Sequence, residues 1–340
     1  MRGFDPKWQD VPHYIIGITK EIWEDRRIGA LITLYADGLI VRSPASVVED
    51  NTNVIAATMA TLAEFPDREL FGEDVIWAET PDFATDTSEA FLSSHRLICT
   101  ATHTGAGVYG APTGKRLTYR ILADCAIRDG AVYDEWLVRD QAAIVAQMGG
   151  DIVGWTRDLI AKEGGAGACM PPLTPDTDVP GPYTGRGNDN EWGARYADTL
   201  RAIMNAGFDV IPARYDRGIA AEYPGDATAL GWLQVDQFWM GLRAAFPDAT
   251  FSVDHVVGRE DPLMPPRAAV RWSLHGTHSG WGRFGRPTGA EVYVMGISHA
   301  EFGPFAGAGP WGEATIRREF TLIDDTAIWK QILLKTGAHP

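Results

Sequence analysis

The feature that most constrains the fold of this chain is an internal repeat. Residues 102–114 read THTGAGVYGAPTG and residues 277–289 read THSGWGRFGRPTG, so eight of thirteen positions are identical at an offset of 175. The match continues in the same order through two further pairs of segments, 119–127 with 294–302 and 134–147 with 318–331. Matches in one order over so much of the chain indicate two copies of one folding unit.

The order of predicted elements is the same in both copies. Apolar residues at helical spacing come first: Tyr14, Ile15, Ile18, Ile22 and Trp23 in one copy, and Tyr196, Leu200, Ile203 and Met204 in the other. A short turn and strand, a second helix and several strands of alternating character follow. Helices followed by an antiparallel sheet are typical of α+β folds and not of alternating βαβ units. A pocket between the helices and the sheet would hold a small ligand.

A stretch rich in Pro and Gly separates the two copies. We therefore expect a first domain over residues 1–163, a linker over 164–189 and a second domain over 190–340. The second copy also carries about nine extra residues at 303–311, read GPFAGAGPW. Because a linker of this length keeps the copies close together, we expect them to pack as an intramolecular pseudo-dimer, with the chain a monomer or a homodimer.

Composition narrows the class of protein. The 340 residues include 30 basic and 45 acidic side chains, and a net charge of −15 disfavours nucleic-acid binding through a broad basic face. The three cysteines, Cys99, Cys125 and Cys169, have neither a disulfide framework nor a zinc-ligand spacing, which favours a cytoplasmic protein without a metal. No apolar run approaches the ~18 residues of a membrane span, and the first thirty residues lack the pattern of a signal peptide.

The repeated motifs resemble those of the SnoaL-like polyketide cyclases, a family of the nuclear transport factor 2-like (NTF2-like) superfamily. In the first copy the matching residues are His103, Gly105, Gly110, Pro112, Thr113, Gly114, Glu135, Trp136, Asp140, Gln147 and Gly149. In the second copy they are His278, Gly280, Gly285, Pro287, Thr288, Gly289, Glu319, Phe320, Asp324 and Gln331. The resemblance implies two tandem α+β cones, each a curved antiparallel sheet with helices on one face.

The resemblance also implies a general acid/base centre. In these cyclases the Asp of a W-x-x-x-D motif is the acid/base of an aldol ring closure, and Asp140 and, by the internal match, Asp324 stand at that position. A histidine on the preceding strand assists in some members, and that position is Asp124 in the first copy and His299 in the second. These four are our candidate catalytic residues. The alternative is that the first two cap the following helices and the others are satisfied polar groups of a pocket wall.

The chemistry expected of such a pocket follows from burial. On a strand, Asp140 shares a face with Val138 and Trp136, so its carboxylate would be partly desolvated and its pKa raised. A base near neutral pKa can take a proton from the carbon next to a carbonyl and return it later. We therefore expect a cyclase- or isomerase-type enzyme that uses enolate or aldol-like chemistry on a small apolar carbonyl compound, without a cofactor or metal.

Several aromatic and histidine side chains are candidates for contact with the ligand. They are Trp136, Trp77, Tyr119, Trp272, Phe320, His103 and His278. Aromatic residues in strands are often plain core, and the two histidines would equally suit a strand bend.

Other functions fit the sequence less well. GAGVYG (105–110) and GWGRFG (280–285) match G-x-G-x-x-G, but Pro-Thr-Gly and a strand follow them instead of a helix. A ketosteroid-isomerase-like site would need a base where Ser43 and Tyr223 stand, and an epoxide-hydrolase-like site would need an Arg at Leu122. The remaining alternative is a non-catalytic protein that binds a small ligand or serves as a scaffold.

Overall fold

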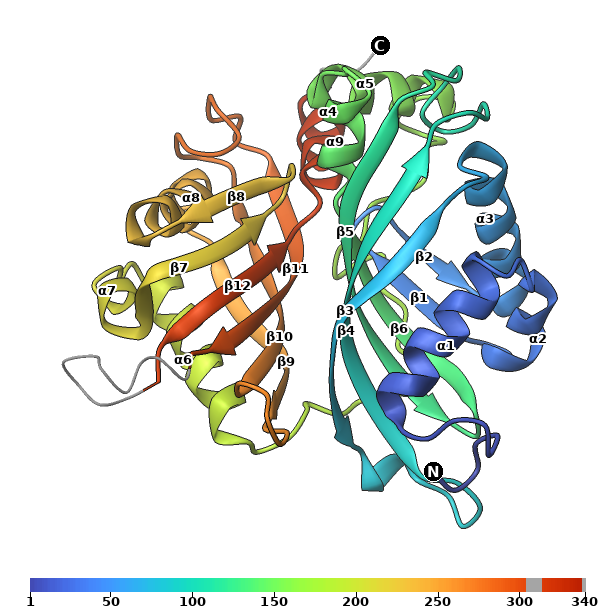
Figure 1. The fold of residues 1–340 in the computed structure, drawn as a ribbon. Coiled ribbons are helices and arrows are strands. Elements are labelled where there is room, and N and C mark those ends of the chain that lie inside the picture. The colour runs from blue at the N-terminus through green and yellow to red at the C-terminus, as the bar shows by residue number, and fades with distance from the viewer. Residues whose placement is uncertain (304–313, 338–340) are drawn as a thin grey trace. The chain divides into compact units, whose positions relative to one another are not determined.

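The chain folds into two compact units (Figure 1). The structure is a computed structural model that describes residues 1–303 and 314–337, so most of the predicted insertion at 303–311 lies outside the described residues. The first unit comprises Met1–Trp155 and Met170–Gly185, and the second comprises Thr156–Cys169 and Arg186–Pro340.

The first unit contains a six-stranded sheet and the helices that cover it. Its helices are α1 (Val11–Trp23), α2 (Leu31–Leu34), α3 (Asn51–Glu64) and α4 (Gln141–Gln147), with short 3-10 turns η1 (Ile28–Ala30) and η2 (Pro81–Phe83). Its strands are β1 (Ile40–Ser43), β2 (Ser46–Glu49), β3 (Glu69–Glu79), β4 (Ala90–Thr102), β5 (Arg116–Arg128) and β6 (Ala131–Arg139). Helix α5 (Ile152–Lys162) begins in the range of the first unit and ends in that of the second.

The second unit repeats this arrangement. Its further helices are α6 (Glu191–Met204), α7 (Val210–Arg214), α8 (Trp232–Ala245) and α9 (Asp325–Thr336). Its strands are β7 (Tyr215–Tyr223), β8 (Ala227–Leu230), β9 (Thr250–Arg259), β10 (Arg267–Thr277), β11 (Glu291–Phe302) and β12 (Ile316–Leu322).

The two sheets have the same topology, which confirms the prediction of two tandem α+β cones. The strand order is β2-β1-β6-β5-β4-β3 in the first and β8-β7-β12-β11-β10-β9 in the second. In each sheet one pair is parallel, β1 with β6 and β7 with β12, and the other neighbours are antiparallel. Among the described residues no helix is both long enough and apolar enough to cross a membrane.

The first helix of each unit forms where the apolar spacing predicts it and packs on its sheet. The Asp10 side chain caps α1 by accepting a hydrogen bond from His13 N at 2.7 Å, and Asn190 caps α6 through Trp192 N at 3.0 Å. The apolar stripe of α1 is buried against β3 and β4, and that of α6 against β9 and β10. The interior of each cone therefore lies between this helix and the inner face of the sheet.

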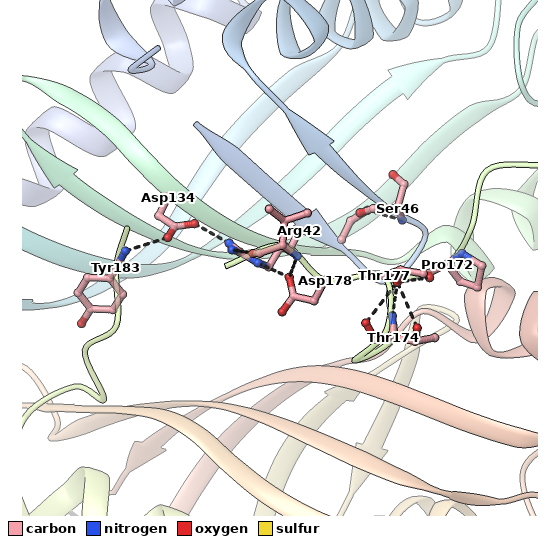
Figure 2. Close-up of polar contacts among 10 residues, drawn as sticks. Arg42, Ser46, Asp134, Pro172, Thr174, Thr177, Asp178 and Tyr183 are labelled. Atoms are coloured by element: carbon pink, nitrogen blue, oxygen red, sulfur yellow. Dashed lines mark hydrogen bonds and ion pairs between the residues drawn. The ribbon is translucent and has the colours of Figure 1, made fainter. Parts of the chain in front are cut away.

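Part of the predicted linker is built into the first unit. Asp178 and Asp134 both bind the buried guanidinium of Arg42, at 2.6 and 2.5 Å, and Tyr183 N donates to Asp134 at 3.0 Å (Figure 2). A Cβ on Gly181 would lie only 2.1 Å from Asp134 Oδ2, so only glycine allows this close approach. Residues 170–185 thus pack on the outer face of the first sheet and do not form a free tether.

Candidate functional site

The interior of the first cone contains a cavity of about 80 Å³. Helix α1 and strands β3 to β6 line it with Ile15, Ile18, Ile22, Trp23, Leu70, Leu97, Ile121, Ala123, Val132 and Leu137. The polar groups of the lining are Thr19, Tyr35, Arg68, His95, Cys125, Glu135 and Arg139. A mostly apolar cavity with a few polar groups is the usual form of a small-ligand site. Its volume is below the ~150 Å³ that holds benzene, so a ligand as large as benzene enters only when side chains of the lining move.

Glu135 is the acid of this cavity. The residue is 7% exposed, and burial raises the pKa of its carboxyl to about 7, although a hydrogen bond from Tyr35 acts in the opposite direction. Its Oε2 atom has no hydrogen-bond partner among the described residues. The carboxyl therefore changes protonation near neutral pH and keeps one oxygen available to a ligand.

His95 faces the same cavity from β4. Burial lowers the pKa of its imidazole to about 4, so the ring is neutral at neutral pH. Its Nδ1 lies 3.3 Å from the Ser93 hydroxyl. Register places Ser93 opposite Cys125, and Cys125 opposite Glu135 on β6, so His95 stands one row from Glu135 on the same face of the sheet.

The equivalent glutamate in the second unit has both carboxylate oxygens occupied by hydrogen bonds from the protein. Glu319 stands opposite Ala300, the counterpart of Cys125 in the repeat, and is fully buried. Its Oε1 accepts hydrogen bonds from Tyr196 at 2.8 Å and Tyr215 at 2.7 Å, and its Oε2 accepts from Tyr223 at 2.6 Å. Trp239 Nε1 adds a fourth hydrogen bond at 3.3 Å. No oxygen of this carboxylate is left for a ligand.

Large aromatic side chains fill the interior of the second cone. Trp272 stands where the repeat has Leu97, and Trp239 where it has Thr58. The Trp272 ring lies so close to Gly296 that a Cβ there would be 2.2 Å from it, and its Nε1 donates to Ser298 Oγ at 2.9 Å. The two units share one fold, but only the first combines that acid with a cavity among the described residues.

Asp140 and Asp324, two of the predicted catalytic residues, cap helices. Asp140 accepts a hydrogen bond from Ala143 N at 3.0 Å at the start of α4. Asp324 accepts from Thr326 N at 2.9 Å and Ala327 N at 3.3 Å at the start of α9, and burial raises the pKa of its carboxyl to about 6. Neither residue lines the cavity of the first unit.

Asp124 and His299, the other two, lie on the outer faces of their sheets. Asp124 stands opposite Trp136, one position from the cavity-lining Ala123, so its side chain points away from the cavity. His299 stands opposite Phe320, one position from Ser298 of the second interior, and also faces outward. Both residues are buried.

The predicted ligand-contacting aromatic residues are dispersed. Trp136 packs under the Arg42 guanidinium at 4.8 Å, on the outer face, and Phe320 lies on the corresponding face of the second sheet. Trp77 packs edge-on against Phe91 in the core. Tyr119 lies on the inner face of the first sheet, in the same core as Leu97. The structure therefore does not gather this set around one ligand.

His103 and His278 fasten the repeated loop. Their Nδ1 atoms lie 3.1 Å from Thr113 Oγ1 and 3.0 Å from Thr288 Oγ1, and both rings are fully buried. His103 Nε2 also lies 3.3 Å from a Glu64 oxygen. Burial lowers the pKa of the His278 imidazole. These contacts hold the loop against the preceding helix, and neither histidine lines the cavity.

No sequence motif predicts a role in the site for Glu135, His95, Arg68 or Arg139. The repeat does mark this glutamate, because Glu135 and Glu319 stand at the same place in the two copies. Each comes one position before a predicted ligand-contacting aromatic residue. Within the described ranges, no three or more His, Cys, Asp or Glu residues gather as metal ligands would.

Known proteins offer structural likeness only. No protein-family model and no curated protein matches the chain. AclR from Streptomyces galilaeus, described as a candidate hydroxylase, aligns over 44% of this chain and 98% of its own, with 19% identity and a TM-score of 0.34. A candidate SnoaL-like polyketide cyclase from Jannaschia sp. CCS1 aligns over 43% and 96%, with 16% identity and a TM-score of 0.35. A SnoaL-like polyketide cyclase from Agrobacterium tumefaciens aligns over 40% and 94%, with 21% identity and a TM-score of 0.30. Each matched protein is thus similar to a part of the chain about the size of one repeat.

Proposed function

We propose that the first unit is an enzyme that moves a proton at the carbon next to a carbonyl group, as cyclases and isomerases do. The observation that carries this proposal is the Glu135 carboxyl, which is buried in the cavity wall with a pKa raised to about 7 and one oxygen without a hydrogen-bond partner among the described residues. A base with this pKa is half ionised at neutral pH and takes a carbon-bound proton more readily than an ordinary glutamate.

The proposed step needs only groups of the cavity wall and a ketone. The Glu135 carboxylate takes the proton, the carbon–hydrogen bond breaks, and its electron pair moves through the new carbon–carbon double bond onto the carbonyl oxygen. The neutral His95 ring supports that oxygen with an N–H, since the Ser93 hydroxyl at 3.3 Å can donate to Nδ1 and leave the proton on Nε2. The protonated Glu135 then returns a proton to carbon.

Deuterium exchange tests the proposal without knowledge of the natural substrate. The probe is 2-pentanone in D2O, and proton NMR follows loss of the hydrogens next to the carbonyl. We expect the full chain to accelerate the exchange, with a rate that rises with pH through about 7 as Glu135 ionises. Glu135→Gln should lower the rate by roughly 100-fold or more, the usual range for loss of a general base.

The second repeat supplies a matched control. Glu319→Gln is the same change at the equivalent position of the filled unit, so the exchange rate per folded molecule should stay at the level of the unchanged chain. Exchange that survives Glu135→Gln, or that falls equally with Glu319→Gln at full folding, overturns the assignment of the reaction to the first cavity.

A protein that binds a small ligand without turning it over is the second candidate. The filled interior of the second unit favours neither ligand binding nor catalysis in that half, because Trp239 and Trp272 occupy the space that a ligand or substrate would need. We propose that the second unit stabilises the chain and carries no reaction. For the first unit, ketone binding detected by calorimetry without any exchange would favour binding alone.

A further inference from the structure

An arginine is buried in the cavity wall of the first unit, and none of the described residues forms an ion pair with it. Arg68 is 1% exposed and lines the cavity. Its Nε donates to Cys99 Sγ at 3.1 Å, and its guanidinium lies 4.2 Å from the centre of the Trp23 ring. Its Nη1 atom has no hydrogen-bond partner among the described residues. A buried cation left in this state is costly unless an anion binds to it.

A second arginine lies at the same end of the cavity. Arg139 is half-buried, lines the cavity, and has an Nε without a hydrogen-bond partner among the described residues. Register places Arg139 opposite Ile121, two residues along β5 from Tyr119, and the Arg68 guanidinium lies 6.0 Å from the centre of the Tyr119 ring. Two positive groups therefore converge on one region of the wall.

This arrangement differs from that of other buried arginines in the chain. Arg42 is buried to a similar degree, but Asp134 and Asp178 neutralise it at 2.5 and 2.6 Å. Arg96 and Arg120 share the Glu73 carboxylate. Within the part of the chain that the structure describes, the cavity arginines have no such acidic neighbour.

The repeat provides an independent comparison. The position of Arg68 in FPDR is Ala249 in FPDA of the second copy, and the position of Arg139 is Ile323. Both replacements are apolar, and they occur in the unit whose interior is filled. The two arginines thus occur only in the unit that has the cavity, and the fold of the other unit forms without them.

The two arginines lie at some distance from Glu135 along the cavity wall. Glu135, Leu137 and Arg139 alternate along the inner face of β6, so the Cα atoms of Glu135 and Arg139 are about 13 Å apart. Arg68 packs on Trp23, the last residue of α1. A ligand that spans the cavity would place one end at the carboxyl and the other at the guanidinium groups.

From this geometry we infer that the cavity binds an anionic ligand, with a carboxylate held by Arg68 and Arg139 and a carbonyl group near Glu135. The substrate class is then a short oxo acid and not a wholly apolar ketone. The reaction at the carbonyl rests on the proposed function, whereas the carboxylate site rests on the arginines alone.

A matched pair of ligands tests the inference. The probes are levulinate, which carries a carboxylate, and 2-pentanone, which carries a methyl group in its place. We expect levulinate to bind about ten-fold or more tightly than 2-pentanone, measured by calorimetry. Arg68→Met and Arg139→Met should each remove most of this preference.

Unfolding measurements separate a ligand site from a structural role. Without ligand, Arg68→Met should keep or raise the unfolding temperature, because it removes an uncompensated buried charge. Arg42→Met, the control at a neutralised buried arginine, should lower it, because it leaves Asp134 buried and unpaired. If Arg68→Met does not fold, the half-buried Arg139→Met carries the test.

The outcomes distinguish this inference from the proposed function. Preference for levulinate without any deuterium exchange would support the carboxylate site and overturn the enzyme. Exchange of both ketones with equal affinity would support the enzyme and overturn the carboxylate site. An Arg68→Met variant that loses stability and keeps its preference for levulinate would also overturn the inference.

Discussion

Glu135 and Glu319 occupy the same position in the two sheets, but only Glu319 has all of its hydrogen-bonding capacity met by the protein. The first stands opposite Cys125 and the second opposite Ala300, which are equivalent in the repeat. Three tyrosines and a tryptophan donate to Glu319, whereas Glu135 keeps an oxygen without a partner among the described residues. One glutamate is structural, and the other is available for chemistry.

The first prediction concerns the stability of these two positions. Glu319→Gln replaces an accepting oxygen by an amide N–H₂ next to donors such as Trp239 Nε1, and should lower the free energy of unfolding by about 2 kcal/mol. Glu135→Gln should cost less than about 0.5 kcal/mol at neutral pH, because an unpaired ionised form is lost. Urea unfolding of both variants measures the difference, and equal losses would contradict it.

The second prediction is a pH dependence of stability. The pKa of Glu135 rises from 4.5 in the unfolded chain to about 7 in the folded one, so the folded state holds the extra proton between these values. Stability from this group is complete below about pH 4.5 and is lost as the pH rises through about 7, a change of about 3 kcal/mol.

Comparison with Glu135→Gln isolates this contribution from that of Asp324 and other acids. The free energy of unfolding of the unchanged chain should fall, relative to the variant, between about pH 4.5 and pH 7. Parallel curves for the two proteins would show that the carboxyl titrates normally.

The third prediction is that the cavity of the first unit can be filled by the aromatic side chain that fills the interior of the second. Leu97→Trp together with Ile121→Gly recreates the pair Trp272 and Gly296, in which the indole lies over the glycine. The indole should occupy the cavity, abolish ketone binding and exchange, and leave the chain folded. Circular dichroism and the exchange assay measure both effects. Ile121→Gly alone is the control and should enlarge the cavity, and exchange that persists in the double variant would place the reaction elsewhere.

The fourth prediction separates capping from catalysis at Asp140 and Asp324. Loss of the cap in Asp140→Ala should lower the free energy of unfolding by about 1 kcal/mol. Asp324→Ala should cost about 1–2 kcal/mol, because its carboxylate also accepts from the Thr326 hydroxyl at 2.7 Å. Exchange rates measured on the folded fraction should stay within about two-fold. A fall of ten-fold or more would instead assign these residues the catalytic role that the family resemblance implies.

The sequence was sufficient for the fold because the repeat supplies a comparison within the chain. Matching THxG loops and helix stripes fixed the order of elements, and both sheets follow it. The inner face of β6 was harder to predict. Trp136 and Glu135 are both buried, since the sheet is covered on both sides, so no alternation of polar and apolar residues marks the cavity. Arg68 was missed because it lies just before β3, in a turn that gives no strand pattern.

The order of segments along the chain has a consequence for anyone who wishes to study the repeats separately. The segments of the two units alternate along the chain. Thr156–Cys169 belongs to the second unit, and Met170–Gly185, which follows it, belongs to the first. A single cleavage, at any peptide bond, therefore leaves at least one repeat without a piece of itself. Separate production of the first repeat therefore requires an internal deletion that joins Trp155 to Met170, because truncation at either end removes part of a repeat.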